Sequence, residues 1–141
     1  MTDVLRAYFA RYAAAFEAYD APAVAAHYAV PALFVRDGVP TTLHSSEELL
    51  DSVERLLDLH RAWGVETSRV AGLTEIEAAP AHRVVRVDWR LGRRASRLRW
   101  TYTTTYVLVP GPVGVDPAAQ PGDPDGAGWL VAAALTHDAP F

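Results

Sequence analysis

The sequence predicts an α+β domain in which three helices near the N-terminus cover one face of a strongly curved antiparallel or mixed sheet. Apolar residues recur at spacings of three and four in the N-terminal part, which is typical of amphipathic helices. From Val65 onwards they recur at every second position, which is typical of strands. A bent sheet closed by helices forms a cone around one hydrophobic hollow, and such hollows bind small molecules.

The first helix is expected over residues 3–19, where large apolar side chains form one stripe. They are Leu5, Tyr8, Phe9, Tyr12, Phe16 and Tyr19. Asp20 is a suitable N-cap and Pro22 suits the first turn of a short second helix, which we expect to reach about Ala29.

The first strand is expected directly after this second helix. Pro31 ends the helix, and the run from Ala32 to Arg36 has the composition of a strand. The turn dipeptide Asp37-Gly38 closes it, and a short extended piece follows.

A third helix is predicted by signals at both of its ends. Ser45 and Glu48 have the spacing of a capping box, and Gly64 stands where a left-handed C-terminal residue is favoured. Between them, one helix face gathers the residues expected to be buried. They are Leu49, Val53, Leu56, Leu57, His60 and Trp63.

Four long strands are expected in the remainder of the chain. The strand-like runs are 65–78, 82–91, 95–109 and 129–137. The segment from about 110 to 128 is dense in Pro, Gly and Asp and has no periodicity, so we expect a long, mobile hairpin loop there.

The composition limits the classes of function. A length of 141 residues fits one domain, spanning 1–141. The absence of cysteine excludes disulfides and thiolate chemistry, and because all 13 basic residues are arginine, Schiff-base chemistry on lysine is excluded as well. A net charge of −4 argues against nucleic-acid binding. We therefore expect a soluble, cytoplasmic protein that acts without nucleic acid, membrane, metal or cofactor.

The capped third helix and three further segments resemble the nuclear transport factor 2-like superfamily, which includes SnoaL-like cyclases and ketosteroid isomerases. The three segments are ARYAAAFEAYDAPAVAAHYAVPALFVRDG, RLRWTYTTTYVLV and GWLVAAALTHD. The resemblance lies in the order of the helices and strands and in the residue pattern of the strands. It covers nearly the whole chain outside 110–128. It implies a cone-shaped fold and a homodimer formed through the outer face of the sheet, whereas a shared fold does not by itself give a reaction.

The ketosteroid isomerase branch offers the most detailed comparison, because its first half aligns with the first half of this sequence without a gap. The resemblance places its oxyanion-hole tyrosine on Tyr12, its general-base aspartate on Arg36 and its protonated acid on Tyr102. An arginine stays protonated and cannot abstract a carbon-bound proton. Isomerase chemistry of that kind is therefore not expected here.

Strand alternation predicts which side chains enter the hollow. If Tyr102 faces inward, so do Leu98, Trp100, Thr104 and Tyr106 on the same run, Val85, Val87 and Trp89 on the preceding run, and Ala133, Leu135 and His137 on the last run. The hollow is then lined by Tyr12, Phe16, Phe34, Trp63, Trp89, Trp100, Tyr102 and Tyr106, with Arg36 and His137 as its most polar groups.

Each of these assignments has an alternative. The aromatic side chains either form a binding site or simply fill the core. Arg36 either anchors an anionic or enolate-like ligand, with Tyr12 and Tyr102 donating hydrogen bonds, or ends its strand in solvent. His137 either acts as an acid or base near neutral pH or lies at the edge of the core.

Two functions remain open at this stage. The first is a small-molecule-binding domain, with an isomerase-, cyclase- or hydrolase-like step on a small hydrophobic or anionic metabolite as its candidate activity. The second is a non-catalytic homodimeric accessory module that binds a partner through its sheet. The second rests on the outward rows of Arg86, Asp88, Arg90, Arg97 and Arg99 and of Thr101, Thr103 and Thr105.

Overall fold

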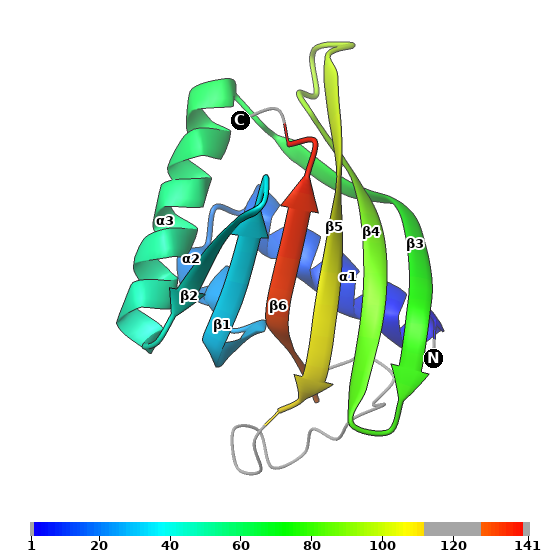
Figure 1. Cartoon of the computed structure of the whole chain (residues 1–141). Coiled ribbons are helices and arrows are strands. Elements are labelled where there is room, and N and C mark those ends of the chain that lie inside the picture. Colours follow the sequence, from blue (N-terminus) through cyan, green and yellow to red (C-terminus); the bar gives the residue numbers. More distant parts are fainter. Residues whose placement is uncertain (1, 112–127, 140–141) are drawn as a thin grey trace.

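The computed structural model describes residues 2–111 and 128–139. Its elements follow the predicted order, with one additional strand, β2 (Figure 1). The elements are α1 (Thr2–Glu17), α2 (Ala21–Ala25), β1 (Tyr28–Arg36), β2 (Val39–Leu43), α3 (Ser46–Trp63), β3 (Thr67–Ala79), β4 (His82–Gly92), β5 (Arg99–Pro110) and β6 (Trp129–His137). Most of the segment predicted as a mobile loop, residues 112–127, lies outside the described residues.

The caps of α2 and α3 form as the sequence predicts. The Asp20 side chain accepts a hydrogen bond from the Ala23 N–H at 3.1 Å. At α3, the Ser45 hydroxyl accepts from the Glu48 N–H at 3.1 Å, and the Glu48 carboxylate accepts from the backbone N–H that precedes the cap. Gly64 ends α3 in the left-handed conformation, at φ 71°. These local hydrogen bonds fix where each helix begins or ends.

The boundary between α2 and β1 differs from the prediction. The helix ends at Ala25 rather than near Ala29, and β1 begins at Tyr28, so Pro31 lies inside a strand instead of ending a helix. Pro31 is tolerated because the register of β1 with β6 shifts between Tyr28 and Leu33, and a strand interrupts its ladder at such an irregularity.

The six strands form one mixed sheet in the order β2-β1-β6-β5-β4-β3. β1 and β6 are parallel, and every other neighbouring pair is antiparallel. Figure 1 shows α1 lying across one face of the curled sheet, while α3 flanks the end that carries β2. The predicted fold class is confirmed. In the part of the chain that the structure describes, no helix is both long and apolar enough to span a bilayer.

The core lies between α1 and the middle of the sheet. Leu5, Tyr8 and Phe9 on α1 are at most 1% exposed, and they face Val85 and Val87 on β4, which are fully buried. The prediction that the alternate residues of β4 point inward is therefore confirmed. Packing of this kind supplies most of the stability of an amphipathic helix.

A β-bulge in β6 reverses the inward and outward alternation along that strand. Leu108 of β5 pairs with Val131, but the adjacent Val107 pairs with Ala133, so Ala132 is an extra residue. Because one inserted residue moves every later side chain to the other face, Ala134 is buried and His137 is exposed. The prediction that Ala133, Leu135 and His137 point into the hollow is wrong for this reason.

Candidate functional site

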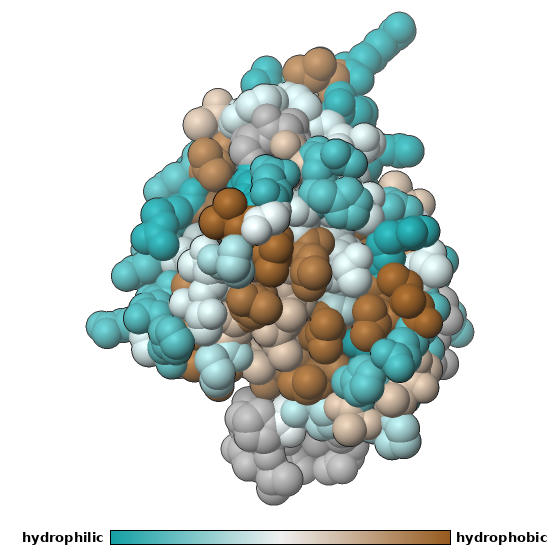
Figure 2. All heavy atoms as spheres, in the orientation of Figure 1, coloured by the Kyte–Doolittle hydropathy of each residue, from teal (hydrophilic) through white to brown (hydrophobic). Residues whose placement is uncertain are grey.

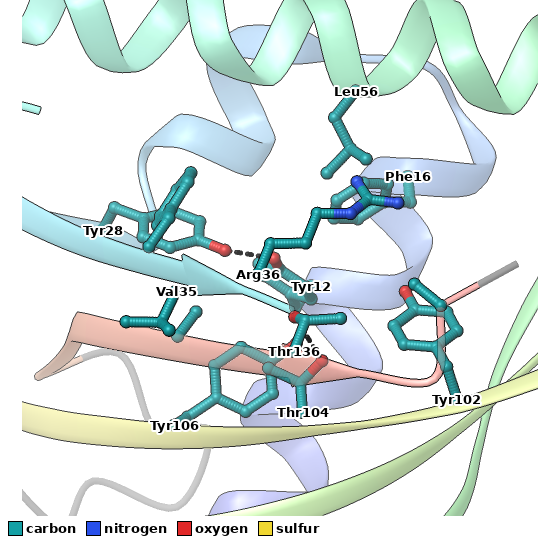
Figure 3. Close-up of a pocket in the computed structure, with 13 residues that line it drawn as sticks. Tyr12, Phe16, Tyr28, Val35, Arg36, Leu56, Tyr102, Thr104, Tyr106 and Thr136 are labelled. Carbon is teal, nitrogen blue, oxygen red and sulfur yellow. Dashed lines mark hydrogen bonds between the residues drawn. The ribbon is translucent and has the colours of Figure 1, made fainter. Parts of the chain in front are cut away.

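A cavity of about 100 Å³ lies inside the cone, between α1, α3, β1, β5 and β6, and is half open to solvent (Figure 3). Most of its wall is aromatic or aliphatic. The described residues that line it are Tyr12, Phe16, Tyr28, Phe34, Val35, Arg36, Leu56, Tyr102, Thr104, Tyr106, Ala134, Thr136 and Ala139. Six of the residues predicted from the sequence are therefore brought together: Tyr12, Phe16, Phe34, Arg36, Tyr102 and Tyr106.

Arg36 is the only charged side chain among the described lining residues. It is the last residue of β1, where it pairs with Thr136 of β6 in parallel register. The side chain is half-buried and extends over the cavity, so its guanidinium lies close to Phe16 and to Leu56 of α3 (Figure 3). Arg36 therefore lines the cavity and does not simply end its strand in solvent.

Hydroxyl groups on the cavity wall form hydrogen-bonded pairs. The Tyr12 hydroxyl on α1 and the Tyr28 hydroxyl on β1 share a hydrogen bond. The Thr104 and Thr136 hydroxyls lie 2.9 Å apart on neighbouring strands. These pairs link α1 to β1 and β5 to β6, and they hold the walls of the cavity in place.

The buried tyrosines remain protonated at ordinary pH. Burial raises the pKa of Tyr12, Tyr28, Tyr102 and Tyr106 well above the usual value for a phenol. The positive charge of Arg36 partly opposes this rise in the pKa of Tyr102, because the two side chains lie at the same end of the cavity. The lining therefore offers hydrogen-bond donors and no anionic group among the described residues.

His60 lies behind the wall formed by Phe16. The two ring centroids are 5.1 Å apart, and His60 is 2% exposed. Burial lowers the pKa of His60 to about 4, and the positive charge of Arg36 contributes in the same direction. At neutral pH the imidazole is therefore uncharged and separated from the cavity by an aromatic ring.

Trp63 and Trp100 do not line the cavity, which corrects the prediction for both. Their rings pack edge to face, with centroids 5.5 Å apart. The Arg93 guanidinium lies 5.8 Å from the Trp100 ring, and its Nη2 donates to the Trp63 carbonyl at 2.6 Å. Figure 1 shows β4 and β5 extending past the end of α3. Trp63 is the last residue of α3 and Trp100 the second residue of β5, so the two rings pack on each other at that end of the domain and not in the cavity. Leu98, also predicted to point inward, precedes β5 and is 49% exposed.

Trp89 and His137 also depart from their predicted places on the cavity wall. Trp89 points inward but lies deeper, where its Nε1 donates to the Tyr106 hydroxyl at 2.9 Å. It borders a separate hollow of about 10 Å³ together with His60, which is too small for more than a water molecule. His137 is exposed on the outer face because of the bulge at Ala132, and it does not approach Arg36 within the cavity.

Sequence reasoning missed several lining residues. Tyr28 was assigned to the second helix, and Ala134 and Thr136 were assigned to the outer face of their strand by simple alternation. Leu56 is part of the predicted buried stripe of the third helix, and this pattern already indicates that its side chain faces the interior. Within the described residues, no group of three His, Cys, Asp or Glu side chains could hold a metal ion.

The curled sheet around an interior cavity is the cystatin-like fold of the NTF2-like proteins. The sequence model of the family described as NTF2-like protein (DUF6841) matches residues 3–112, so this chain belongs to that family. The resemblance seen in the sequence is thereby confirmed. No curated protein has a significantly similar sequence.

Several solved structures share the fold. An NTF2-like protein of unknown function from Pseudomonas putida KT2440 has a TM-score of 0.67 and 16% identity, over 97% of this chain and 84% of that one. A ketosteroid isomerase-like protein from Erwinia carotovora atroseptica has a TM-score of 0.58 and 18% identity, over 94% and 92%. A putative calcium/calmodulin dependent protein kinase II association domain from Xanthomonas campestris has a TM-score of 0.61 and 15% identity, over 96% and 86%. At such identities these similarities establish the fold alone.

Proposed function

We propose that this protein binds a small organic molecule in the cavity inside the cone. The observation that carries the proposal is a half-open hollow of about 100 Å³ among large side chains, with a guanidinium at one end. Protein interiors are otherwise packed with few voids larger than a water molecule. An apolar hollow with a few convergent polar groups is the usual form of a small-molecule site.

The composition of the lining favours binding over proton abstraction. The described lining residues contain no carboxylate and no imidazole, and burial keeps the pKa of the tyrosine hydroxyls high. A general base must accept a proton within hydrogen-bond reach of its substrate. The position that the ketosteroid isomerase resemblance assigns to the base holds Arg36. We propose the Tyr102 hydroxyl as a donor to the ligand, whereas the Tyr12 hydroxyl stays bonded to that of Tyr28.

Ligand binding is tested by a thermal-shift screen of small aromatic and carboxylate-bearing compounds. A compound that binds only the folded state raises the melting temperature. The matched control is Ala134→Leu, because Ala134 is 8% exposed and lines the cavity, so a larger side chain there occupies the ligand's space. The proposal fails if no compound shifts the wild-type protein, or if the hits shift Ala134→Leu equally.

A second candidate function rests on the outer face of the sheet. Leu135 is 39% exposed there, and half-buried Ala133 lies between Leu33 and Val107 in register. Figure 2 shows hydrophobic side chains gathered over the middle of the sheet face. On the same side of the sheet, the Asp88 carboxylate accepts from the Thr103 hydroxyl at 3.0 Å. We propose that this face forms a homodimer, as an alternative or in addition to ligand binding.

The dimer is tested by light scattering coupled to gel filtration at micromolar concentration. A dimer is expected for the wild type, and Leu135→Asp should convert it to a monomer because a charge would be buried in the interface. Leu59→Asp on α3 is the control, since Leu59 is similarly exposed, at 40%. A monomeric wild type contradicts the dimer and leaves the cavity proposal intact.

A further inference from the structure

We infer that the cavity selects a small monocarboxylic acid in its anionic form, with the carboxylate at Arg36 and the apolar body against the aromatic wall. This inference rests on the proposed function and names the ligand class for the same cavity. It follows from the distribution of charge, of hydroxyl groups and of volume around the cavity.

The charge of the lining favours a single anionic group. Arg36 supplies the one positive charge among the described lining residues, and no aspartate or glutamate stands among them. A guanidinium offers five N–H donors in a planar fork that matches the two oxygens of a carboxylate. A neutral ligand of the same shape forms weaker hydrogen bonds with a guanidinium than a carboxylate does.

Four of the hydroxyl groups in the lining are hydrogen-bonded to one another in pairs. The Tyr12 and Tyr28 hydroxyls bond to each other, and Thr104 and Thr136 form a second pair. The Tyr106 hydroxyl accepts from Trp89 Nε1, and the Tyr102 hydroxyl of β5 points toward the guanidinium (Figure 3). A ligand with one polar end therefore fits this cavity better than a polyhydroxylated one, which would have to displace hydrogen bonds already formed.

The remaining wall is apolar. Phe16, Phe34, Val35, Leu56 and Ala134 surround the space beside the guanidinium. A fully polar anion such as inorganic phosphate would lose hydration against these side chains without replacement hydrogen bonds. The apolar wall therefore favours an organic anion whose carbon skeleton occupies that space.

The volume sets the size of the acid. Dry cavities of about 150 Å³ accept benzene. This cavity, at about 100 Å³, is smaller but partly open to solvent, so an acid of the size of benzoate fits with one edge at the mouth. Longer fatty acids and multi-ring compounds exceed this space.

Isothermal titration calorimetry with benzoate and its neutral analogue benzamide tests the charge requirement. Benzoate is expected to bind about 10- to 100-fold more tightly than benzamide, the range for hydrogen bonds to charged groups. In Arg36→Gln this preference should fall to about twofold or less. Arg36→Lys keeps the charge without the planar fork, so an intermediate preference is expected. Circular dichroism and the melting temperature establish that each variant is folded.

The possible outcomes separate this inference from the proposed function. Equal binding of benzoate and benzamide, or a preference that survives in folded Arg36→Gln, overturns the carboxylate assignment while small-molecule binding stands. Inorganic phosphate that competes as well as benzoate overturns it too, because a fully polar anion would then suffice. If benzoate fails to bind but another class of compound stabilises the wild type, only the inference fails. If no compound in the screen binds, both fail.

Discussion

Two regions inside the same cone are built from similar residues and differ in how completely they are filled. Around Phe9, the side chains of α1 meet Val85, Val87 and Leu108, and all four residues are fully buried. Around Arg36, aromatic side chains instead surround a cavity. Among the strand residues that face that cavity, three are small or short: Thr104, Ala134 and Thr136. Aromatic side chains of the same kind therefore fill the core in one region and line a cavity in the other.

Truncation of one ring in each region gives the largest expected contrast. Phe9→Ala should lower the free energy of unfolding by about 3–5 kcal/mol, because it opens a hole in a filled core. Phe34→Ala should cost clearly less, since Phe34 is half-buried and already borders the cavity. Urea denaturation measures both values. Equal losses would show that the cavity region is as tightly packed as the core.

Acidification tests the border between the two regions, where His60 is buried. Burial lowers its pKa to about 4 from 6.5, so the unfolded chain takes up a proton first as the pH falls. The free energy of unfolding that depends on neutral His60 is fully present above pH 6.5. It is lost as the pH falls toward 4, by about 3 kcal/mol at most. The His60→Phe variant should lack this part of the loss in urea denaturation measured across that range. Parallel pH profiles for the two proteins would contradict it.

Enlarging one side chain in each region tests the same difference in packing by adding volume where the previous variants removed it. Val87→Phe should destabilise the protein by about 1–3 kcal/mol, because the core around it has no space for a ring. Ala134→Leu should be nearly neutral, since the added carbons enter the cavity. Thermal denaturation compares the two. An equal loss for Ala134→Leu would mean that its wall cannot accept more volume.

The smallest effect is expected at the hydroxyl pair that joins α1 to β1. Removing both hydroxyls, as in Tyr12→Phe combined with Tyr28→Phe, deletes their hydrogen bond and should cost about 0.5–1.5 kcal/mol. Each single variant leaves one buried hydroxyl without this partner, so a double-mutant cycle should give a favourable coupling energy. Additive single effects would show that the pair contributes nothing to holding the cavity wall.

Features specified by neighbouring residues could be predicted from the sequence. Helix α3 is an example, since Ser45, Glu48 and Gly64 act through hydrogen bonds and backbone geometry within a few residues. The meeting of Tyr12, Arg36 and Tyr102 at one cavity was also predicted, from the resemblance combined with strand alternation. Their roles toward a ligand remain proposals.

Features that depend on pairing between distant segments could not be predicted. The bulge at Ala132 leaves no trace in the sequence, because residues 129–135 are all apolar and show no alternation to interrupt. The start of β1 at Tyr28 was obscured by the alanine-rich run before it, which favours helix. Pairing with β6 overrides that local preference. The exposed position of His137 and the lining position of Tyr28 both follow from these two tertiary effects.

The central place of β6 in the sheet has a consequence for how the protein is made. Among the described strands, β6 alone joins the β1–β2 hairpin to the β3–β4–β5 meander, and it is translated after both of them. While the ribosome still holds residues 129–137, the two pieces have no shared ladder and each exposes an unpaired edge. Folding of the whole sheet therefore waits for β6, and a nascent chain that lacks β6 is exposed to aggregation and chaperone binding.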